Sequence, residues 1–114
     1  MNWIKLNHPQ QLTQLLEDSK QRPVLIFKHS SRCSISRAAL DRLERNWKAE
    51  EAGQIDQYFL DLLSYREISN QIERLFQVDH ESPQVLVVDK GKVIYHRSHF
   101  DIDYRNLMNS LKVA

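Results

Sequence analysis

A continuous apolar run, Val24 to Phe27, is the sequence feature that most constrains the fold. Side chains of successive strand residues point to opposite sides, so a strand that is apolar at every position is typical of the centre of a sheet covered on both faces. Before this run, a helix is predicted that opens at Asn7 and Pro9 and buries Leu12, Leu15 and Leu16. The chain is therefore predicted to be an α/β protein with this run in the middle of its sheet.

Further apolar patterns continue the alternation of strands and helices along the chain. The predicted strands cover residues 3–6, 57–62, 85–88 and 93–95, and the predicted helices cover about 34–53, 64–76 and 101–113. The helix at 64–76 opens on a capping-box pattern, Ser64 to Glu67. Inward-facing positions are expected at Ile35, Ala39, Leu43, Trp47, Ile68, Ile72, Leu75, Phe76, Ile102, Leu107, Met108 and Leu111. The last two strands are joined by residues 89–92 and are predicted to form an antiparallel hairpin.

Length and charge restrict the class of protein. At 114 residues the chain is long enough for one domain, which we expect to span residues 1–114. The net charge of +1, from 16 basic and 15 acidic side chains, provides no broad field of the kind that holds nucleic acid or an anionic membrane. The first residues lack the long apolar segment of a signal peptide. We expect a soluble, cytoplasmic monomer that binds neither nucleic acid nor membrane.

The only cysteine, Cys33, lies where the apolar run gives way to the helix predicted from Ser34. A strand-to-helix junction directs unpaired backbone N–H groups and the positive end of the helix dipole at the residue that opens the helix, and both favour a thiolate over a thiol. Lys28, Arg32 and Arg37 add positive charge nearby. A lone cysteine is often a small buried hydrophobe, but here its neighbours are serines and an arginine. The pattern favours a reactive thiol.

A single cysteine also restricts the chemistry that the chain can perform. It cannot form an internal disulfide, and it cannot by itself form a cysteine-based metal site. We therefore expect no bound metal and no bound cofactor. Any disulfide that Cys33 forms must join it to another molecule.

Two later segments are predicted to lie at the same end of the sheet as Cys33. In the hairpin, the residues that leave the last strand lie opposite those that enter the preceding one, which puts Ser98-His99-Phe100 beside Ser82-Pro83-Gln84. Cys33 joins them if the strand ending at Phe27 pairs antiparallel with the strand beginning at Val85. The order of elements is the thioredoxin-like arrangement, a mixed sheet of four or five strands flanked by about four helices.

Three separated segments carry a combination of motifs. They are K-H-S-S-R-C-S-I-S at residues 28–36, V-D-H-E-S-P-Q at 78–84 and S-H-F-D-I at 98–102. Together they resemble the monothiol bacilliredoxin family of the thioredoxin superfamily, and the resemblance covers nearly the whole chain. The most specific part is the joint occurrence of H-E-S-P-Q and S-H, because the C-x-x-S tetrad alone is short. The resemblance implies a cis peptide bond before Pro83.

The resemblance implies a thiol–disulfide oxidoreductase that removes bacillithiol from protein mixed disulfides. The implied catalytic residue is Cys33, whose thiolate attacks the bacillithiol sulfur, frees the client cysteine and carries bacillithiol until a low-molecular-weight thiol or a reductase resolves the adduct. Bacillithiol is then a co-substrate, and bacillithiolated client proteins are the implied partners. The implied substrate-binding residues are Ser34, Ile35, Ser36, Ser82, Pro83 and His99.

The chain departs from the family pattern around the cysteine. Family members commonly show T-C-P-I-S, whereas Arg32 and Ser34 flank Cys33 here. The absence of a proline after Cys33 restores a backbone N–H that can reach the thiolate and removes a constraint on φ at the start of the helix. Ser36 occupies the position of the resolving cysteine of C-x-x-C redox proteins. Intramolecular release of the adduct is therefore excluded.

Two alternatives remain open on the sequence. A glutathione-linked monothiol glutaredoxin is one, although the relatives that bind iron–sulfur clusters resemble C-G-F-S and this chain has Ser34-Ile35 instead. A non-catalytic thioredoxin-like binding module is the other, with an inert Cys33 and a peptide held in the groove by Pro83.

The remaining polar residues have structural as well as chemical interpretations. His29, His80 and His99 lie near the predicted site, where each either donates a proton or hydrogen-bonds a loop. Charged residues after Cys33 are expected to form the solvated face of a helix: Asp41, Arg42, Glu44, Arg45, Lys48, Glu50 and Glu51.

Overall fold

A five-stranded mixed sheet with helices on both sides is described by the computed structural model over residues 1–112. The strands are β1 (Ile4–Lys5), β2 (Val24–His29), β3 (Asp56–Asp61), β4 (Gln84–Asp89) and β5 (Lys92–Ser98). The helices are α1 (Gln10–Asp18), α2 (Ser34–Asn46), α3 (Ala49–Ala52), α4 (Arg66–Phe76) and α5 (Tyr104–Lys112), with a 3₁₀ turn, η1 (His99–Asp101), before the last. Apart from the separation of α2 from α3 and the added η1, this order is the predicted one.

The sheet has the strand order β1-β3-β2-β4-β5, so β2 is the central strand, as the sequence predicts. β1 and β2 run parallel to β3, whereas β4 runs antiparallel to both β2 and β5. Phe27 pairs with Val85, which confirms the predicted antiparallel pairing. The C-terminal end of β2 therefore lies beside the beginning of β4. Cys33 follows β2 at this end of the sheet.

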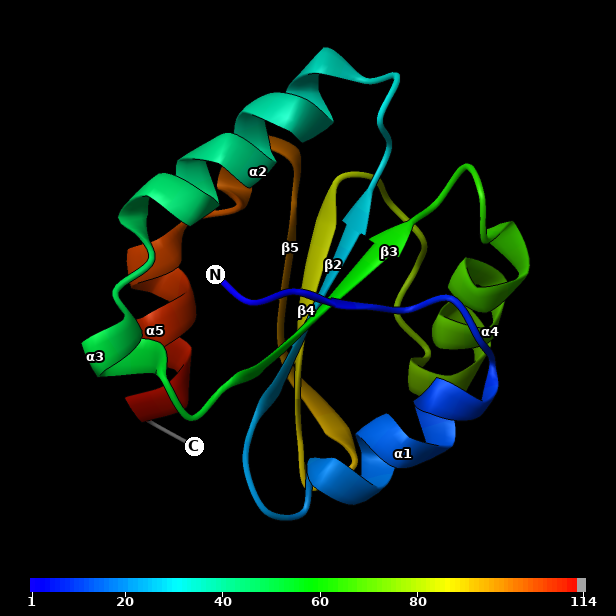
Figure 1. Ribbon diagram of the computed structural model, residues 1–114, viewed down its shortest axis with the longest axis horizontal. Coiled ribbons are helices and arrows are strands. Elements are labelled where there is room, and N and C mark those ends of the chain that lie inside the picture. Colours follow the sequence, from blue (N-terminus) through cyan, green and yellow to red (C-terminus); the bar gives the residue numbers. More distant parts are fainter. Residues whose placement is uncertain (113–114) are drawn as a thin grey trace.

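Helices cover both faces of the sheet (Figure 1). α2, α3 and α5 lie on one side and α1 and α4 on the other, and none of these helices is long and apolar enough to cross a membrane within residues 1–112. β2 contributes to both cores, because Leu25 and Phe27 pack under α2 and α5 while Val24 and Ile26 pack under α1 and α4. Each such buried side chain contributes about 1.5 to 3 kcal/mol relative to an exposed one. The uninterrupted apolar run of β2 follows from this double burial.

A two-residue turn, Lys90-Gly91, joins β4 and β5 in the predicted hairpin. Lys90 and Gly91 have φ values of 52° and 78°, and positive φ at both central residues is what a type I′ turn requires. The N–H of Lys90 donates to the carbonyl oxygen of Ser19 at 2.8 Å, and the N–H of Gly91 donates to Ser19 Oγ at 2.9 Å. The hairpin is thereby fixed to the end of α1.

The single helix predicted over residues 34–53 is interrupted, which corrects that prediction. Trp47 and Lys48 adopt extended backbone and separate α2 from the short α3. Trp47 instead packs edge-on against Tyr104 of α5, with ring centroids 5.4 Å apart. Burial of this aromatic pair outweighs the local preference for helix.

Two predicted helix signals act differently in the folded chain. The capping box over Ser64–Glu67 does not form, because Ser64 Oγ donates to Asp61 Oδ2 at 3.0 Å and the N-cap residue of α4 makes no side-chain capping bond. Gly53 ends α3 with right-handed backbone, at φ −63°. Its role is close approach, since a Cβ there would lie 2.7 Å from the carbonyl oxygen of Ala49.

The closing helix begins later than predicted. η1 follows β5 directly, and α5 starts only at Tyr104, after Asp103 accepts the backbone N–H of Asn106 at 2.9 Å. This aspartate satisfies one of the unpaired N–H groups at the start of the helix. Val113, the last residue of the predicted helix, lies outside the described residues.

Several side chains of the predicted helix faces lie elsewhere. Leu75 is 47% exposed rather than buried, because it borders an open groove between α1 and α4. The predicted solvated face after Cys33 also makes tertiary contacts: Trp3 Nε1 donates to Glu44 Oε2 at 2.9 Å, and Arg42 donates to the carbonyl oxygen of Ile102 at 2.9 Å. Charged side chains on this helix therefore help to attach distant parts of the chain.

Candidate active site

Cys33 is the N-cap residue of α2 and is partly exposed. Its backbone is extended, with φ −103° and ψ 121°, and its carbonyl oxygen accepts a hydrogen bond from the N–H of Arg37 at 3.1 Å. The first N–H groups of a helix have no partner within the helix, and the first turn of α2 carries no acidic residue. Cys33 therefore lies at the positive end of a helix dipole, as the sequence predicts.

The turn before Cys33 is held by two hydrogen bonds. The N–H of Cys33 donates to the carbonyl oxygen of Ser30 at 3.1 Å, and the guanidinium of Arg37 donates to the carbonyl oxygen of Ser31 at 2.8 Å. Arg37 thus places its positive charge against this turn, which agrees with the expectation from the sequence.

Ser36 and His29 form a buried pair beneath the same turn. Ser36 is fully buried, its Oγ lies 2.7 Å from His29 Nδ1, and it accepts the N–H of Ser30 at 3.0 Å. The His29 ring lies 5.3 Å from the ring of Phe59, and burial lowers the pKa of His29 below its usual 6.5. Ser36 has no exposed surface, so it supports the turn rather than lining the surface that a substrate meets.

Pro83 and His99 lie at the end of the sheet where the central strand β2 finishes. Gln84 pairs with Lys28 of β2 on one side and with Ser98 of β5 on the other. The N–H of His99 donates to the carbonyl oxygen of Pro83 at 3.0 Å. The predicted placement of residues 98–100 beside residues 82–84 is confirmed.

Ser82 and Pro83 form the segment that enters β4. The peptide bond between them is cis, which is the isomer that the family resemblance implies. Pro83 is buried, and Ser82 Oγ is a buried hydroxyl without a hydrogen-bond partner among residues 1–112. Buried hydroxyls usually have a partner, so the unpaired Ser82 Oγ is an exception at this end of the sheet.

Lys28 does not add its charge to the surroundings of Cys33, which corrects the prediction. Successive strand residues point to opposite faces, so Lys28 lies on the face covered by α4 while the next residue, His29, contacts α2. Lys28 is fully buried, and its Nζ lies 3.3 Å from His80 Nδ1. Burial lowers the pKa of Lys28 from 10.5 to about 8, against the opposing effect of the Glu73 carboxylate.

His80 connects this lysine to α4. Ser69 Oγ lies 3.2 Å from His80 Nδ1, and the backbone N–H of His80 donates to Glu73 Oε2 at 2.6 Å. Burial lowers the pKa of His80 below its usual 6.5, and the charge of Lys28 lowers it further. This network was not predicted from the sequence. Its signal in the sequence is a lysine directly after the apolar run of the central strand.

The surface beside Cys33 is partly apolar. Ser34 and Ile35 open α2 at the surface, and Ile35 is 36% exposed. Phe100 is 76% exposed and belongs to η1, which packs against α2. α2 and η1 thus each present an exposed apolar side chain.

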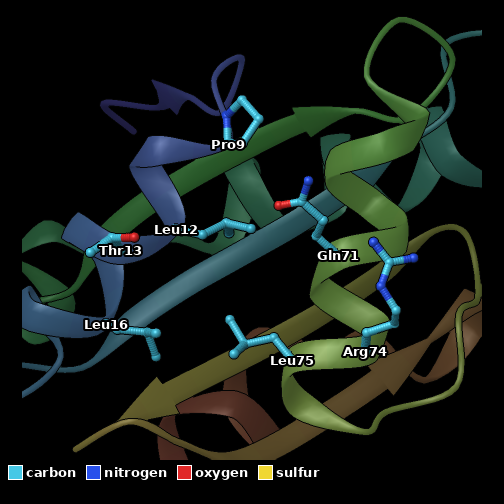
Figure 2. Close-up of a pocket in the computed structure, with 7 residues that line it drawn as sticks. All are labelled: Pro9, Leu12, Thr13, Leu16, Gln71, Arg74 and Leu75. Carbon is cyan, nitrogen blue, oxygen red and sulfur yellow. The ribbon is translucent and has the colours of Figure 1, made fainter.

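The groove between α1 and α4 is a separate feature (Figure 2). It has a volume of about 400 Å³ and is lined in part by Leu12 and Leu16 of α1 and by Arg74 and Leu75 of α4. Cys33 opens α2, which covers the opposite face of the sheet (Figure 1). Within residues 1–112, no three His, Cys, Asp or Glu side chains form a group that could hold a metal ion.

Comparison with known proteins identifies the family. The model of the family described as monothiol bacilliredoxin BrxC matches residues 4–107. The chain belongs to the monothiol bacilliredoxin family. A solved structure described as a proposed oxidoreductase with a thioredoxin fold is 32% identical to this bacilliredoxin family member, with a TM-score of 0.81, and the match covers 95% of this chain and 92% of that chain.

Thioredoxins share the fold at lower identity. The thioredoxin of Malassezia sympodialis (Mala s 13) is 12% identical with a TM-score of 0.75, covering 98% of this chain and 90% of that chain. The thioredoxin of Fasciola hepatica is 16% identical with a TM-score of 0.73, covering 96% of each chain. These likenesses show the predicted thioredoxin-like fold alone. Together with the bacilliredoxin family membership, the fold supports a thiol oxidoreductase.

Proposed function

We propose that this bacilliredoxin removes bacillithiol from protein mixed disulfides and uses Cys33 as its nucleophile. The observation that carries the proposal is the position of the only cysteine in the sequence, partly exposed at the N-cap of α2. Unpaired backbone N–H groups and the helix dipole stabilise an attacking thiolate at such a position. A chain with one cysteine can form a disulfide only with another molecule, and the family that it matches is described as monothiol.

The first step of the proposed reaction is a thiol–disulfide exchange. The Cys33 thiolate attacks the bacillithiol sulfur, the bond between that sulfur and the client sulfur breaks, and the client leaves as a thiolate that takes a proton from solvent. Cys33 then carries bacillithiol in a new disulfide. A second low-molecular-weight thiol, or the thiol of a reductase, attacks the bacillithiol sulfur of this adduct and releases the Cys33 thiolate. The electrons that reduce the client therefore come from the second thiol.

We propose that the segment from Ser82 to Pro83 contacts the disulfide of the client. This segment lies at the end of the sheet where β2 leads to Cys33, and it carries the unpaired Ser82 hydroxyl. His99 supports this segment through its backbone bond to Pro83. The exposed side chains of Ile35 and Phe100 would contact the client protein around its cysteine. A thiol that must stay reduced between turnovers fits a cytoplasmic protein.

The proposal is tested with a single-cysteine protein that carries bacillithiol in a mixed disulfide. After mixing, intact mass spectrometry should show a free client thiol and one bacillithiol on Cys33. Cys33→Ser should produce neither species, because a serine hydroxyl does not attack a disulfide as a thiolate does. A Cys33→Ser protein that still removes bacillithiol would end the proposal.

The two alternatives are outcomes of the same assay. Faster removal of glutathione than of bacillithiol from the same client would identify a glutathione-linked glutaredoxin. Removal of neither thiol, with Cys33 alkylated no faster than free cysteine, would identify a non-catalytic binding module. Either result would replace the proposed function.

A further inference from the structure

Lys28 is a fully buried lysine that the proposed exchange reaction does not use. It lies in the central strand β2, and none of the ion pairs within residues 1–112 involves its amine. Taking a charged amine out of water costs free energy unless another group compensates for the lost hydration. The Lys28 amine therefore needs a partner outside the ion pairs, a group that accepts a hydrogen bond from it.

That partner is the imidazole of His80. Lys28 has a pKa of about 8, and below that pH its ammonium has three donors and no acceptor. The contact of 3.3 Å between Lys28 Nζ and His80 Nδ1 therefore makes Nδ1 the acceptor and places the ring proton on Nε2. Ser69 Oγ, 3.2 Å from the same nitrogen, adds a second group on α4. The neutral ring is thus held from both β2 and α4.

His80 begins the segment that leads to Pro83. Its backbone N–H donates to Glu73 Oε2 at 2.6 Å, so the main chain as well as the ring is attached to neighbouring elements. Gln84 Nε2 donates to the carbonyl oxygen of Asp79 at 3.0 Å, which closes the segment on itself. The position of Pro83 is therefore determined by β4 on one side and by His80 on the other.

We propose that His80, held by Lys28, is a positioning residue for the exchange at Cys33. It fixes residues 80–83, so that Ser82 and Pro83 meet the disulfide of an incoming client in the correct place. His80 acts through this segment and does not touch the reacting sulfurs. The inference rests on the proposed function, because it assigns a task to the segment on which that function places the client.

Acid should break the hydrogen bond between Lys28 and His80 by protonating the His80 ring. The charged groups that face His80 are Lys28 from β2, Arg66 and Glu73 from α4, and Glu81 from its own segment. Burial and the two cations disfavour protonation of the ring, and the two carboxylates favour it. A protonated ring has no acceptor at Nδ1 and lies against a second positive charge. Reduction of a client should therefore fall in acid more steeply than alkylation of the thiol.

Two substitutions of His80 separate positioning from general stability. His80→Leu removes the acceptor, whereas His80→Asn keeps an acceptor oxygen near the place of Nδ1 but does not titrate. For each protein we would measure KM and kcat with the bacillithiolated single-cysteine client and the rate at which iodoacetamide alkylates Cys33. His80→Leu should raise KM roughly tenfold and leave alkylation unchanged, since a displaced binding segment affects the client alone. His80→Asn should restore KM and abolish the additional decline in acid.

Three results would overturn the inference. They are a wild-type KM in His80→Leu, an alkylation rate that falls in parallel with client reduction, and an acid decline that persists in His80→Asn. If His80→Leu does not fold, the pH profile of His80→Asn decides the question.

A measurement without activity distinguishes failure of this inference from failure of the proposed function. In Lys28→Met, the pKa of His80 followed by NMR should rise, because a neighbouring positive charge is removed. An unchanged titration would overturn the role of Lys28. Failure of the proposed function would appear as a wild-type protein that removes no bacillithiol, while the His80 titration would still respond to Lys28→Met.

Discussion

The Ser36 hydroxyl lies 2.7 Å from His29 Nδ1, directly beneath the turn that carries Cys33. The same oxygen accepts the backbone N–H of Ser30 at 3.0 Å, so a single buried side chain joins the first turn of α2 to the end of β2. The residue at the position of a resolving cysteine thus has a structural task in this chain. Two predictions follow from its surroundings.

Ser36→Ala should lower the free energy of unfolding by about 1 to 3 kcal/mol, because the His29 nitrogen and the Ser30 N–H lose a buried partner. Urea unfolding measures this change, and the rate of adduct formation at Cys33 should remain close to that of the natural protein. Ser34→Ala is the matched control, since Ser34 is exposed and its replacement should change stability by less than about 0.5 kcal/mol. Equal stability of the two variants would contradict the buried bond.

Ser36→Cys should shorten the lifetime of the bacillithiol adduct. Residues 33 and 36 have a helical i, i+3 spacing, so a second thiol there can attack the adduct and close an internal disulfide. The natural protein should hold its adduct until an external thiol arrives. Intact mass spectrometry over time compares the two, and identical adduct lifetimes would show that the position cannot resolve Cys33.

Acid should destabilise the protein through His29. The unfolded chain binds a proton at His29 with the usual pKa of 6.5, whereas burial lowers the pKa of His29 in the folded protein. Between these two values the unfolded state holds more protons, so the free energy of unfolding falls as pH decreases below about 6.5. His29→Asn should flatten this dependence, and the exposed control His8→Asn should not. Urea unfolding at pH 5 and pH 7 would test the slope, and equal slopes in all three proteins would exclude His29 as its source.

Lys28 should produce a dependence of the same sign at alkaline pH. In the unfolded chain the pKa of Lys28 is 10.5, and in the folded protein burial lowers it to about 8. Between these two pH values Lys28 is deprotonated in the folded protein and protonated in the unfolded chain, so unfolding takes up a proton. Stability should therefore rise as pH increases from about 8 toward 10.5. Lys28→Met should remove this rise and add about 1 kcal/mol at neutral pH, as replacement of buried charge by an apolar group often does. The exposed Lys92→Met should keep the rise, and its presence in Lys28→Met would contradict the assignment.

Features that depend on neighbouring residues could be predicted from the sequence. The apolar run Val24–Phe27 predicted the central strand, and Lys90-Gly91 predicted the turn of the hairpin. The change from apolar run to helical periodicity predicted Cys33 at the start of a helix. Strand periodicity, turn chemistry and helix starts are set by residues close in sequence, so local pattern was sufficient.

Contacts between distant residues were decided only by the tertiary structure. The break between α2 and α3 at Trp47 depends on packing against Tyr104. The capping box does not form because the Ser64 hydroxyl donates to Asp61 instead. Lys28 and His29 are adjacent in sequence, yet the alternation of the strand directs one to His80 and the other to Ser36. The sequence by itself determined the central strand, with Lys28 and His29 at its end and Cys33 at the start of the next helix. Only packing of the two helix layers determined their partners, because burial and hydrogen bonding depend on which surfaces the folded chain brings together.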